Sequence, residues 1–170
     1  LGKGKGISRP GFQARNAHHM KIKTRRIDRS LPLPTYEKAS ACFDLICREA
    51  AVLKPGEIKL VPSNSVIRIP EGYAVLLFPR SSTPIKKGLM LANGVAVIDS
   101  VFSGHNDEMM LQFRNITDHD VEIKRGEILV QAMLVKHETV EWEEVEKIEE
   151  KGRGGYHGGV LHRPNKKTTA

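Results

Sequence analysis

The sequence has no long hydrophobic segment. None of its apolar runs approaches the roughly 20 residues that a helix needs to cross a bilayer. The basic N-terminus is also not followed by a short apolar stretch with a small-residue cleavage site, which is the signature of an export signal. We therefore expect a protein that does not span a membrane, is not exported and acts in the cytoplasm.

Cysteine is scarce, with only two residues in the chain. On one strand, Cys42 and Cys47 would point to opposite faces and could not form a disulfide. Reduced thiols are typical of a cytoplasm-like compartment. None of the seven histidines stands at a metal-ligand spacing from the cysteines, which argues against a structural zinc site.

Acidic residues are outnumbered, and the formal net charge is +7. Such an excess suggests nucleic-acid binding, because clustered basic side chains neutralise phosphates. However, the basic residues crowd the two ends of the chain, and the segment ETVEWEEVEKIEE is acidic. Tails of this kind are usually solvated, so we predict no nucleic-acid binding by them. The alternative predicts a salt-sensitive affinity for DNA that disappears when residues 1–19 and 163–170 are removed.

A length of 170 residues is sufficient for one domain with a hydrophobic core, whereas two domains would each be marginal. We expect this domain over residues 20–148. Residues 1–19 are interpreted as a basic extension, disordered or added for expression, because Met20 is a candidate natural start. Residues 149–170 form a C-terminal arm. Its glycine-rich sequence KGRGGYHGG cannot fold alone and is either disordered or ordered by a ligand.

The domain is predicted to be all-β. The segments SVIRI, YAVLLF, GVAVI, MMLQF, VEIK and EILVQAMLV are short and rich in β-branched and aliphatic residues. Connectors such as KPGE and KRGE leave no room for crossover helices, which favours antiparallel strands in a sandwich or barrel. A short helix is expected only at STPIKKGLM, with Pro84 in its first turn. HETVEWEEVEKIEE is expected to continue as a strand or to fray into an acidic linker.

PRSS, at residues 79–82, follows the apolar segment YAVLLF. An arginine, two serine hydroxyls and free backbone N–H groups at a helix start can bind an anion such as a phosphate. The same residues also fit a capped turn with an exposed arginine. The residues alone leave both interpretations open.

The segment NGVAVID predicts that Val95, Val97 and Asp99 share one face of a strand and that Ala96 and Ile98 take the other. A strand buried on both faces would end with Asp99 at a semi-buried rim. A carboxylate there can hold and deprotonate a water as a general base. A turn-capping aspartate explains the residue equally well.

Two further elements carry polar groups whose role the residues do not decide. Gln131 lies in the apolar run EILVQAMLV, so its amide is either bonded within the core or directed at a polar ligand. In the arm, Lys151 and Arg153 supply positive charge, and Tyr156 supplies a flat ring that can stack on a base. The alternative for the arm is an unstructured basic tail.

Five segments, in this order, resemble the five motifs of the trimeric deoxyuridine triphosphatase (dUTPase) family: DRSLPLPTYEKASACFDL, PRSSTPIKKGL, NGVAVIDSVFSG, RGEILVQAML and KGRGGYHGG. The resemblance extends from about Lys21 to Gly159. It implies a distorted jelly-roll barrel and a homotrimer whose active sites lie between subunits and are closed by the C-terminal arm. It also implies Mg²⁺-dependent hydrolysis of dUTP to dUMP and pyrophosphate.

The resemblance also implies roles for single residues around the base and sugar. Asp99 matches the acid that activates the attacking water. Phe102 matches the aromatic residue, usually tyrosine, that packs under the deoxyribose and rejects a ribose 2′-hydroxyl by steric clash. Asn93 matches a residue at the base pocket. The remaining positions assigned to base and sugar are Gly94, Ile98, Met110 and Tyr156.

A second group of positions matches the phosphate and metal sites of the family. Asp44 matches an acid near the waters of the Mg²⁺ ion, without direct coordination. Phosphoryl-transfer enzymes depend on positioning, metal and cationic groups around the developing charge. The positions assigned to the phosphates are Arg80, Ser81, Ser82, Gln131, Lys151 and Arg153.

The chain departs from the usual motifs at several positions. The family's IDxDYRG is IDSVFSG here, so that Val101 replaces an acid, Phe102 a tyrosine and Ser103 an arginine. Cys42 and Ala96 stand where glycines are common, and the arm's GFGST has become YHGGV. Losing the tyrosine hydroxyl should matter little if the ring discriminates. Losing the arm's hydroxyls should weaken triphosphate binding. The departures as a group bear on base selectivity more than on phosphate chemistry.

Two other readings compete with dUTP hydrolysis. The related dCTP deaminases share the jelly roll and an RSS motif, but they need a glutamate in the strand after the third motif. Here that strand reads MMLQF, with Gln112 and no acid, and Glu108 in the preceding turn is the nearby candidate. The other reading is a nucleotide-binding module that has lost turnover, against which the retained Asp99 argues.

Overall fold

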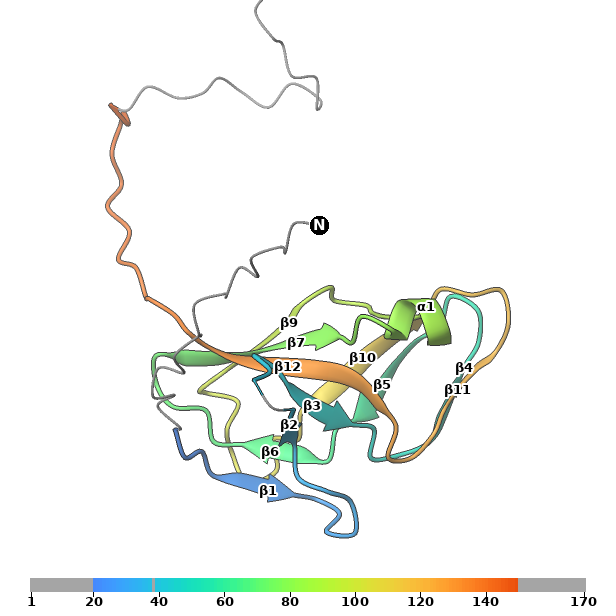
Figure 1. Ribbon diagram of the computed structural model, residues 1–170. Helices are drawn as coiled ribbons and strands as arrows, with labels where there is room; N and C mark the ends of the chain where they lie inside the picture. The colour runs from blue at the N-terminus through green and yellow to red at the C-terminus, as the bar shows by residue number, and fades with distance from the viewer. Residues whose placement is uncertain (1–19, 38, 150–170) are drawn as a thin grey trace, which may run out of the picture. The chain divides into compact units, whose positions relative to one another are not determined.

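A computed structural model describes residues 20–37 and 39–149 of the chain (Figure 1). The chain divides into two units, residues 1–139 and 140–170. All elements of regular structure in the described residues lie in the first unit, which has twelve short strands and one short helix. Their bounds are β1 (Thr24–Arg26), β2 (Thr35–Tyr36), β3 (Phe43–Ile46), β4 (Ala51–Leu53), β5 (Ile58–Pro62), β6 (Ser65–Ile67), β7 (Tyr73–Pro79), α1 (Thr83–Lys87), β8 (Leu89–Leu91), β9 (Ala96–Asp99), β10 (Met110–Asn115), β11 (Val121–Ile123) and β12 (Ile128–Lys136).

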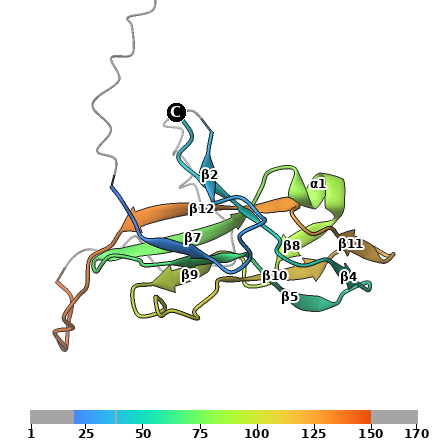
Figure 2. The same cartoon turned by 90° about the horizontal axis from the view of Figure 1, so that it is seen from below.

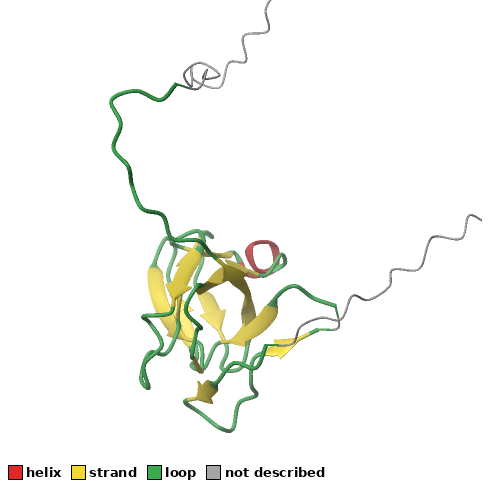
Figure 3. Ribbon diagram, turned by 90° about the vertical axis from the view of Figure 1, so that its left-hand side faces the viewer, coloured by secondary structure: helices red, strands yellow, loops and turns green. Residues whose placement is uncertain are grey.

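All strand pairings are antiparallel. The largest sheet has five strands in the order β2-β3-β12-β7-β9, and a second has three in the order β5-β10-β8. Two further pairs, β1-β6 and β11-β4, make up the rest of the strands in the described part of this unit. In Figure 3 the strands surround a common interior and the helix lies outside them. The prediction of an all-β, jelly-roll type of barrel is confirmed.

β12 is the central strand of the largest sheet. It pairs with β3 on one side and with β7 on the other, and Figure 2 shows β12 and β7 side by side. Its register with β7 runs from Val130 opposite Pro79 to Lys136 opposite Tyr73. A strand bonded on both sides is held rigidly, so side chains on β12 and its neighbours have well-defined positions.

β10 shows how the sequence fills the interior. Its alternate residues Leu111, Phe113 and Asn115 are fully buried, whereas the residues between them face outward. Burying each large apolar side chain contributes about 1.5–3 kcal/mol. The Asn115 amide is also satisfied, because it donates to the carbonyls of Leu53 at 2.9 Å and His119 at 2.7 Å.

Both cysteines are free thiols, as predicted. Cys42 precedes β3 and is half-buried, whereas Cys47 follows β3 and is fully buried. Burial raises the pKa of the Cys47 thiol to about 12. Cys47 is therefore protonated at neutral pH and behaves as a small apolar core residue.

The predicted short helix is present as α1, with Ser82 as its N-cap and Pro84 in its first turn. Gly88 ends it in a left-handed conformation with φ of 64°, and a Cβ there would lie 2.0 Å from Thr117 Cγ2. Glycine is therefore required by both backbone and packing. No helix of the described residues is long and apolar enough to cross a membrane.

The acidic segment after β12 forms neither strand nor helix where it is described. β12 ends at Lys136, and residues 140–149 have no regular secondary structure. Of the two alternatives left by the sequence, continuation of the strand is not observed.

Candidate active site

The structure brings Asp44, Arg80 and Gln131 together, and we call these three residues the phosphate-side group. Gln131 of β12 lies opposite Asp44 of β3 on one side and opposite Phe78 of β7 on the other. Arg80 directly follows β7, and its Nε lies 3.5 Å from Asp44 Oδ1. Residues from motifs far apart in the sequence therefore meet across three neighbouring strands.

The side chains of the phosphate-side group keep polar atoms available. The Asp44 side chain is 17% exposed and the Arg80 side chain 36%. Gln131 donates from Nε2 to the carbonyl of Pro79 at 3.2 Å. Its amide is thus bonded within the sheet, as one of the two predicted alternatives required. That bond still leaves Oε1 and the second N–H for a ligand.

The turn after β7 is held by a residue that sequence reasoning did not single out. Thr83 is buried, and its hydroxyl donates to the carbonyl of Leu129 at 2.7 Å, while the Arg80 N–H donates to the same carbonyl at 3.0 Å. Ser81 is exposed, and Ser82 makes no side-chain capping hydrogen bond. The two serine hydroxyls are therefore not required for the turn, which weakens the interpretation of PRSS as a capped turn only.

Asp99 ends β9, at the edge of the largest sheet. Its Oδ1 accepts a hydrogen bond from the Val101 N–H at 3.1 Å, so the turn-capping interpretation is correct. The bond uses one carboxylate oxygen and leaves Oδ2 for a water. A capping aspartate at this place can therefore also act as a base.

The prediction that β9 is buried on both faces is wrong for the single chain. Ala96 is buried and Ile98 half-buried, but Val95 is exposed and Val97 is 64% exposed on the face that also carries Asp99. The physical reason is that β9 is an edge strand, whose outer face is not covered by any described part of this chain. Asp99 is accordingly exposed rather than semi-buried.

The segment after β9, residues 99–108, is called the Asp99 loop below. It places the Phe102 ring three residues after the acid and leaves it 41% exposed. Ser103 fixes this part of the loop, because its buried Oγ accepts a hydrogen bond from the Ile69 N–H at 3.1 Å. Met110, at the start of β10, is exposed beyond the loop's end.

Asn93 and Gly94 lie in the turn between β8 and β9. Gly94 has a φ of 70° and donates its N–H to the Leu91 carbonyl at 3.1 Å, so it closes the turn in a left-handed conformation. The Asn93 side chain is exposed. The turn therefore presents backbone and amide groups at the end of β9 opposite to Asp99, with Ile98 half-buried between them.

The phosphate-side group and Asp99 lie at opposite ends of β7. Asp99 pairs with Ala74 near the start of that strand, whereas Arg80 follows its last residue. The interval from residue 74 to residue 80 spans about 20 Å of extended chain. A single copy thus does not bring the acid next to the arginine.

Glu108, the candidate for the deaminase reading, has a structural role. Its carboxylate accepts two hydrogen bonds from Arg48 at 2.9 Å and one from the Asn64 N–H at 2.7 Å, and its side chain is 12% exposed. These bonds raise the pKa of Arg48. A carboxylate engaged in this way is not available to act on a base.

Comparison with known proteins decides the family. The dUTPase family model matches residues 29–159. The deoxyuridine 5′-triphosphate nucleotidohydrolases of Lactococcus lactis and Finegoldia magna are 36% and 37% identical, covering 68% and 77% of this chain and 79% and 90% of their own. The crystal structure of the Streptococcus mutans dUTPase matches with a TM-score of 0.64 and 32% identity, over 70% of this chain and 98% of that one.

The chain belongs to the dUTPase family. The motif resemblance is thereby confirmed, and the two groups of polar residues at the ends of β7 are the candidate active-site residues of a dUTPase. Lys151, Arg153 and Tyr156 lie outside the described residues.

The described residues offer few direct ligands for a metal ion. Residues 20–37 and 39–149 contain no group of three or more His, Cys, Asp or Glu side chains that could hold a metal directly. Asp44 contributes a single carboxylate, and that carboxylate faces Arg80. Mg²⁺ usually keeps several waters and binds through one or two carboxylates and substrate phosphates. The donor set therefore suits a hydrated magnesium ion brought with a triphosphate.

Proposed function

We propose that this chain hydrolyses dUTP to dUMP and pyrophosphate. Family membership and its named relatives support the substrate. The observation that carries the proposal is the grouping of motif residues at the two ends of β7: an acid with a free oxygen beside an aromatic ring, and an arginine, an amide and a carboxylate on adjacent strands.

In the proposed reaction, Asp99 accepts a proton from a water as the water oxygen attacks the α-phosphorus. The new P–O bond forms while the bond from the α-phosphorus to the α,β-bridging oxygen breaks, and pyrophosphate leaves with that oxygen. The Phe102 ring packs under the deoxyribose, and Asn93, Gly94, Ile98 and Met110 line the sugar and base.

The phosphate-side group binds the triphosphate in this proposal. Arg80 offers fixed donors that match phosphate oxygens, and Gln131 with Ser81 and Ser82 adds neutral donors. Their role is to hold the chain of phosphates in line and to offset the charge that develops on the leaving group.

Magnesium is the proposed cofactor. Asp44 would hold it through water, and the ion would neutralise charge on the triphosphate. A structure of the dUTPase from phage phi11 of S. aureus, which is 22% identical to this chain, was described with a structural Mg(II) ion.

We also propose a homotrimer with shared sites. The separation of Asp99 from Arg80 along β7 supports it, because a site containing both residues needs more than one copy. The outward face of the β5-β10-β8 sheet also exposes several large apolar side chains, which is unusual for a monomer. These side chains are Ile58, Leu60, Met90 and Met110.

Outside the described residues, Lys151 and Arg153 are proposed to contact the phosphates and Tyr156 to stack on the base. Two free thiols support the further proposal that the protein acts in the cytoplasm.

The test is to incubate the full chain with dUTP, dCTP, dTTP and UTP and to measure pyrophosphate and ammonia separately. Pyrophosphate from dUTP, with little from the other nucleotides and without ammonia, is the expected result. Ammonia from dCTP would instead establish a deaminase, and nucleotide binding without either product would establish a binding module.

A further inference from the structure

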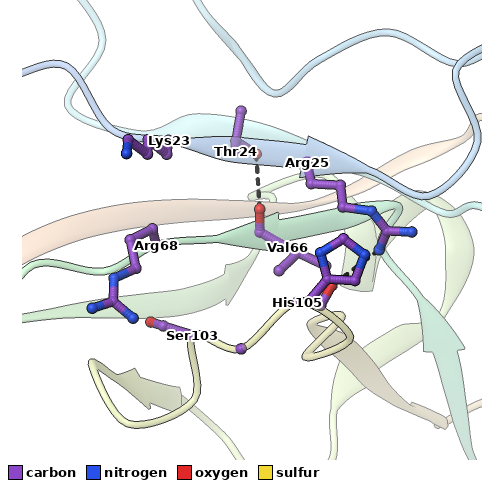
Figure 4. A pocket seen from close by; sticks show the side chains of 8 residues that line it. Lys23, Thr24, Arg25, Val66, Arg68, Ser103 and His105 are labelled. Carbon is purple, nitrogen blue, oxygen red and sulfur yellow. Dashed lines mark hydrogen bonds between the residues drawn. The ribbon is translucent and has the colours of Figure 1, made fainter.

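A second concentration of polar groups lies beside the Asp99 loop and is used by no step of the proposed reaction. It surrounds a cavity of about 160 Å³ between β1, the segment that continues β6, and the loop (Figure 4). The residues that line it are Lys23, Thr24, Arg25, Val66, Arg68, Ser103, Gly104 and His105.

The lining is cationic. Lys23 and Arg68 are brought together because the Arg68 N–H donates to the Lys23 carbonyl at 2.9 Å. Arg25 reaches across to the loop and donates to the His105 carbonyl at 3.0 Å. No Asp or Glu lines the cavity, and within residues 20–37 and 39–149 the side chains of Lys23, Arg25 and Arg68 form no ion pair.

Ser103 adds a neutral donor to this lining. Its Oγ accepts the hydrogen bond from Ile69, so its own O–H is free to donate. In Figure 4 its hydroxyl lies on the side of the cavity where the Arg68 guanidinium ends. The hydroxyl of Thr24, by contrast, is already used in a bond of 3.1 Å to the Val66 carbonyl. The carboxylate of Asp107 accepts a hydrogen bond from the N–H of the lining residue Gly104 at 2.7 Å.

We infer that this cavity is a binding site for a small phosphate-class anion, orthophosphate or pyrophosphate. Unpaired basic side chains around a concave site attract an anion, and guanidinium groups match the geometry of phosphate oxygens. The volume is well below the roughly 300–1,000 Å³ of pockets that hold drug-sized ligands. A single anion therefore fits better than a nucleotide.

A bound anion would connect three separate segments: the residue that precedes β1 through Lys23, the continuation of β6 through Arg68, and the Asp99 loop through Ser103. Ligands that bind only the folded state stabilise it, and the stabilisation grows with the ratio of ligand concentration to Kd. The anion would therefore stabilise the chain and restrain the loop. The site rests on the charges and the cavity alone and does not depend on dUTP hydrolysis.

Calorimetric titration of the full chain with pyrophosphate, and separately with orthophosphate, tests the inference. The Arg80→Gln variant serves as background, so that binding at the candidate active site is reduced. In that background we expect Lys23→Gln with Arg68→Gln to weaken binding at least tenfold. Lys124→Gln with Lys136→Gln removes the same charge from exposed positions outside the cavity and should change it less than twofold.

Equal loss in both double variants would show a general effect of net charge and would overturn the inference, as would undiminished binding in the cavity variant. A 12-nucleotide single-stranded DNA is the competing ligand. If it binds tenfold more tightly than pyrophosphate and through the same two residues, the cavity is part of a nucleic-acid surface and the small-anion assignment is wrong. Melting temperatures of all variants without anion check that each is folded.

Discussion

The two halves of the candidate active site are built in contrasting ways. The phosphate-side group stands on β3, β12 and the end of β7, strands in the middle of the largest sheet, and its turn is fixed by Thr83. Asp99 stands on an edge strand, at the start of a loop held by isolated hydrogen bonds. The groups proposed to hold substrate thus stand on strands that are bonded on both sides, whereas the acid and the ring depend on an edge strand and the loop that follows it.

The largest effect is expected from Asp99→Asn. Removing the proposed general base should lower kcat by about 10²–10⁴-fold, since this is the usual contribution of a positioned base. Asparagine keeps a carbonyl oxygen that can accept the hydrogen bond from the Val101 N–H, so the melting temperature should not change. Steady-state release of pyrophosphate from dUTP measures the change.

Asp107→Asn is the matched control, because it removes one negative charge from the same loop and keeps the acceptor for Gly104. It should retain nearly full turnover. Undiminished activity of Asp99→Asn would exclude the acid from the mechanism.

The separation of the two halves can be tested by mixing inactive variants. Asp99→Asn and Arg80→Gln chains, unfolded together in equal amounts and refolded, should recover about a quarter of the wild-type activity if each site takes the acid and the arginine from different copies of a closed homo-oligomer. Each variant refolded alone is the control. A mixture no more active than its components would place both residues in the same copy.

Replacing the Phe102 ring of the Asp99 loop is expected to have a smaller effect on activity than replacing Asp99. Phe102→Ala should remove the steric barrier to a ribose 2′-hydroxyl and lower the ratio of kcat/KM for dUTP over UTP by about tenfold, the scale expected when a hydrophobic contact is lost. Phe43→Ala does not test this, because Phe43 is buried in the core. Val101→Ala, next to the ring and exposed, is the suitable control and should leave the ratio unchanged.

On the rigid half, Thr83→Val should lower the free energy of unfolding by about 0.5–1.5 kcal/mol, because one of the two hydrogen bonds to the Leu129 carbonyl is lost while the Arg80 N–H keeps the other. Thr83→Ser keeps the hydroxyl and should retain most of the stability. Denaturant unfolding measures both. KM for dUTP should rise in Thr83→Val while the sugar selectivity stays constant, and a change in selectivity instead would show that the two halves are not independent.

The contrast also explains what the sequence could predict. Alternating apolar residues and short polar connectors are sufficient to predict strands, antiparallel pairing and the free cysteines. The meeting of Asp44 with Gln131 depends on register between β3 and β12, which no local pattern encodes. The prediction that β9 is buried on both faces was wrong for a related reason. An apolar sequence such as GVAVI does not indicate whether the second face of its strand is covered by the same chain or left open at an edge of the sheet. The sequence did not indicate the structural role of Thr83, since that role is a hydrogen bond to a backbone carbonyl in β12, which is distant in the sequence.

The smallest expected effect is on the pH dependence of stability, and it concerns Asp28, which is linked to Glu108 at the end of the Asp99 loop. Glu108 bonds Asn64, whose side chain in turn bonds the backbone of Asp28. Hydrogen bonds from Ser30 and then Arg125 lower the pKa of Asp28 from 3.8 to about 2. Because the pKa is lower in the folded state, the stabilisation is present above about pH 4 and is lost as the pH falls toward 2.

Asp28→Asn should therefore reduce the melting temperature slightly at pH 6 and much less at pH 2, so that the difference from the wild type shrinks across this interval. The pKa of Glu57 is also lowered, chiefly by the Lys54 N–H. Glu57 contributes equally to the pH dependence of the wild type and of the variant, so its effect cancels in the difference between their melting temperatures. Thermal unfolding followed by circular dichroism at pH 6, 4, 3 and 2 measures the difference. A constant offset would mean that the Asp28 side chain stabilises the fold independently of its charge. No offset at any pH would mean that Asp28 acts on the loop through its backbone alone.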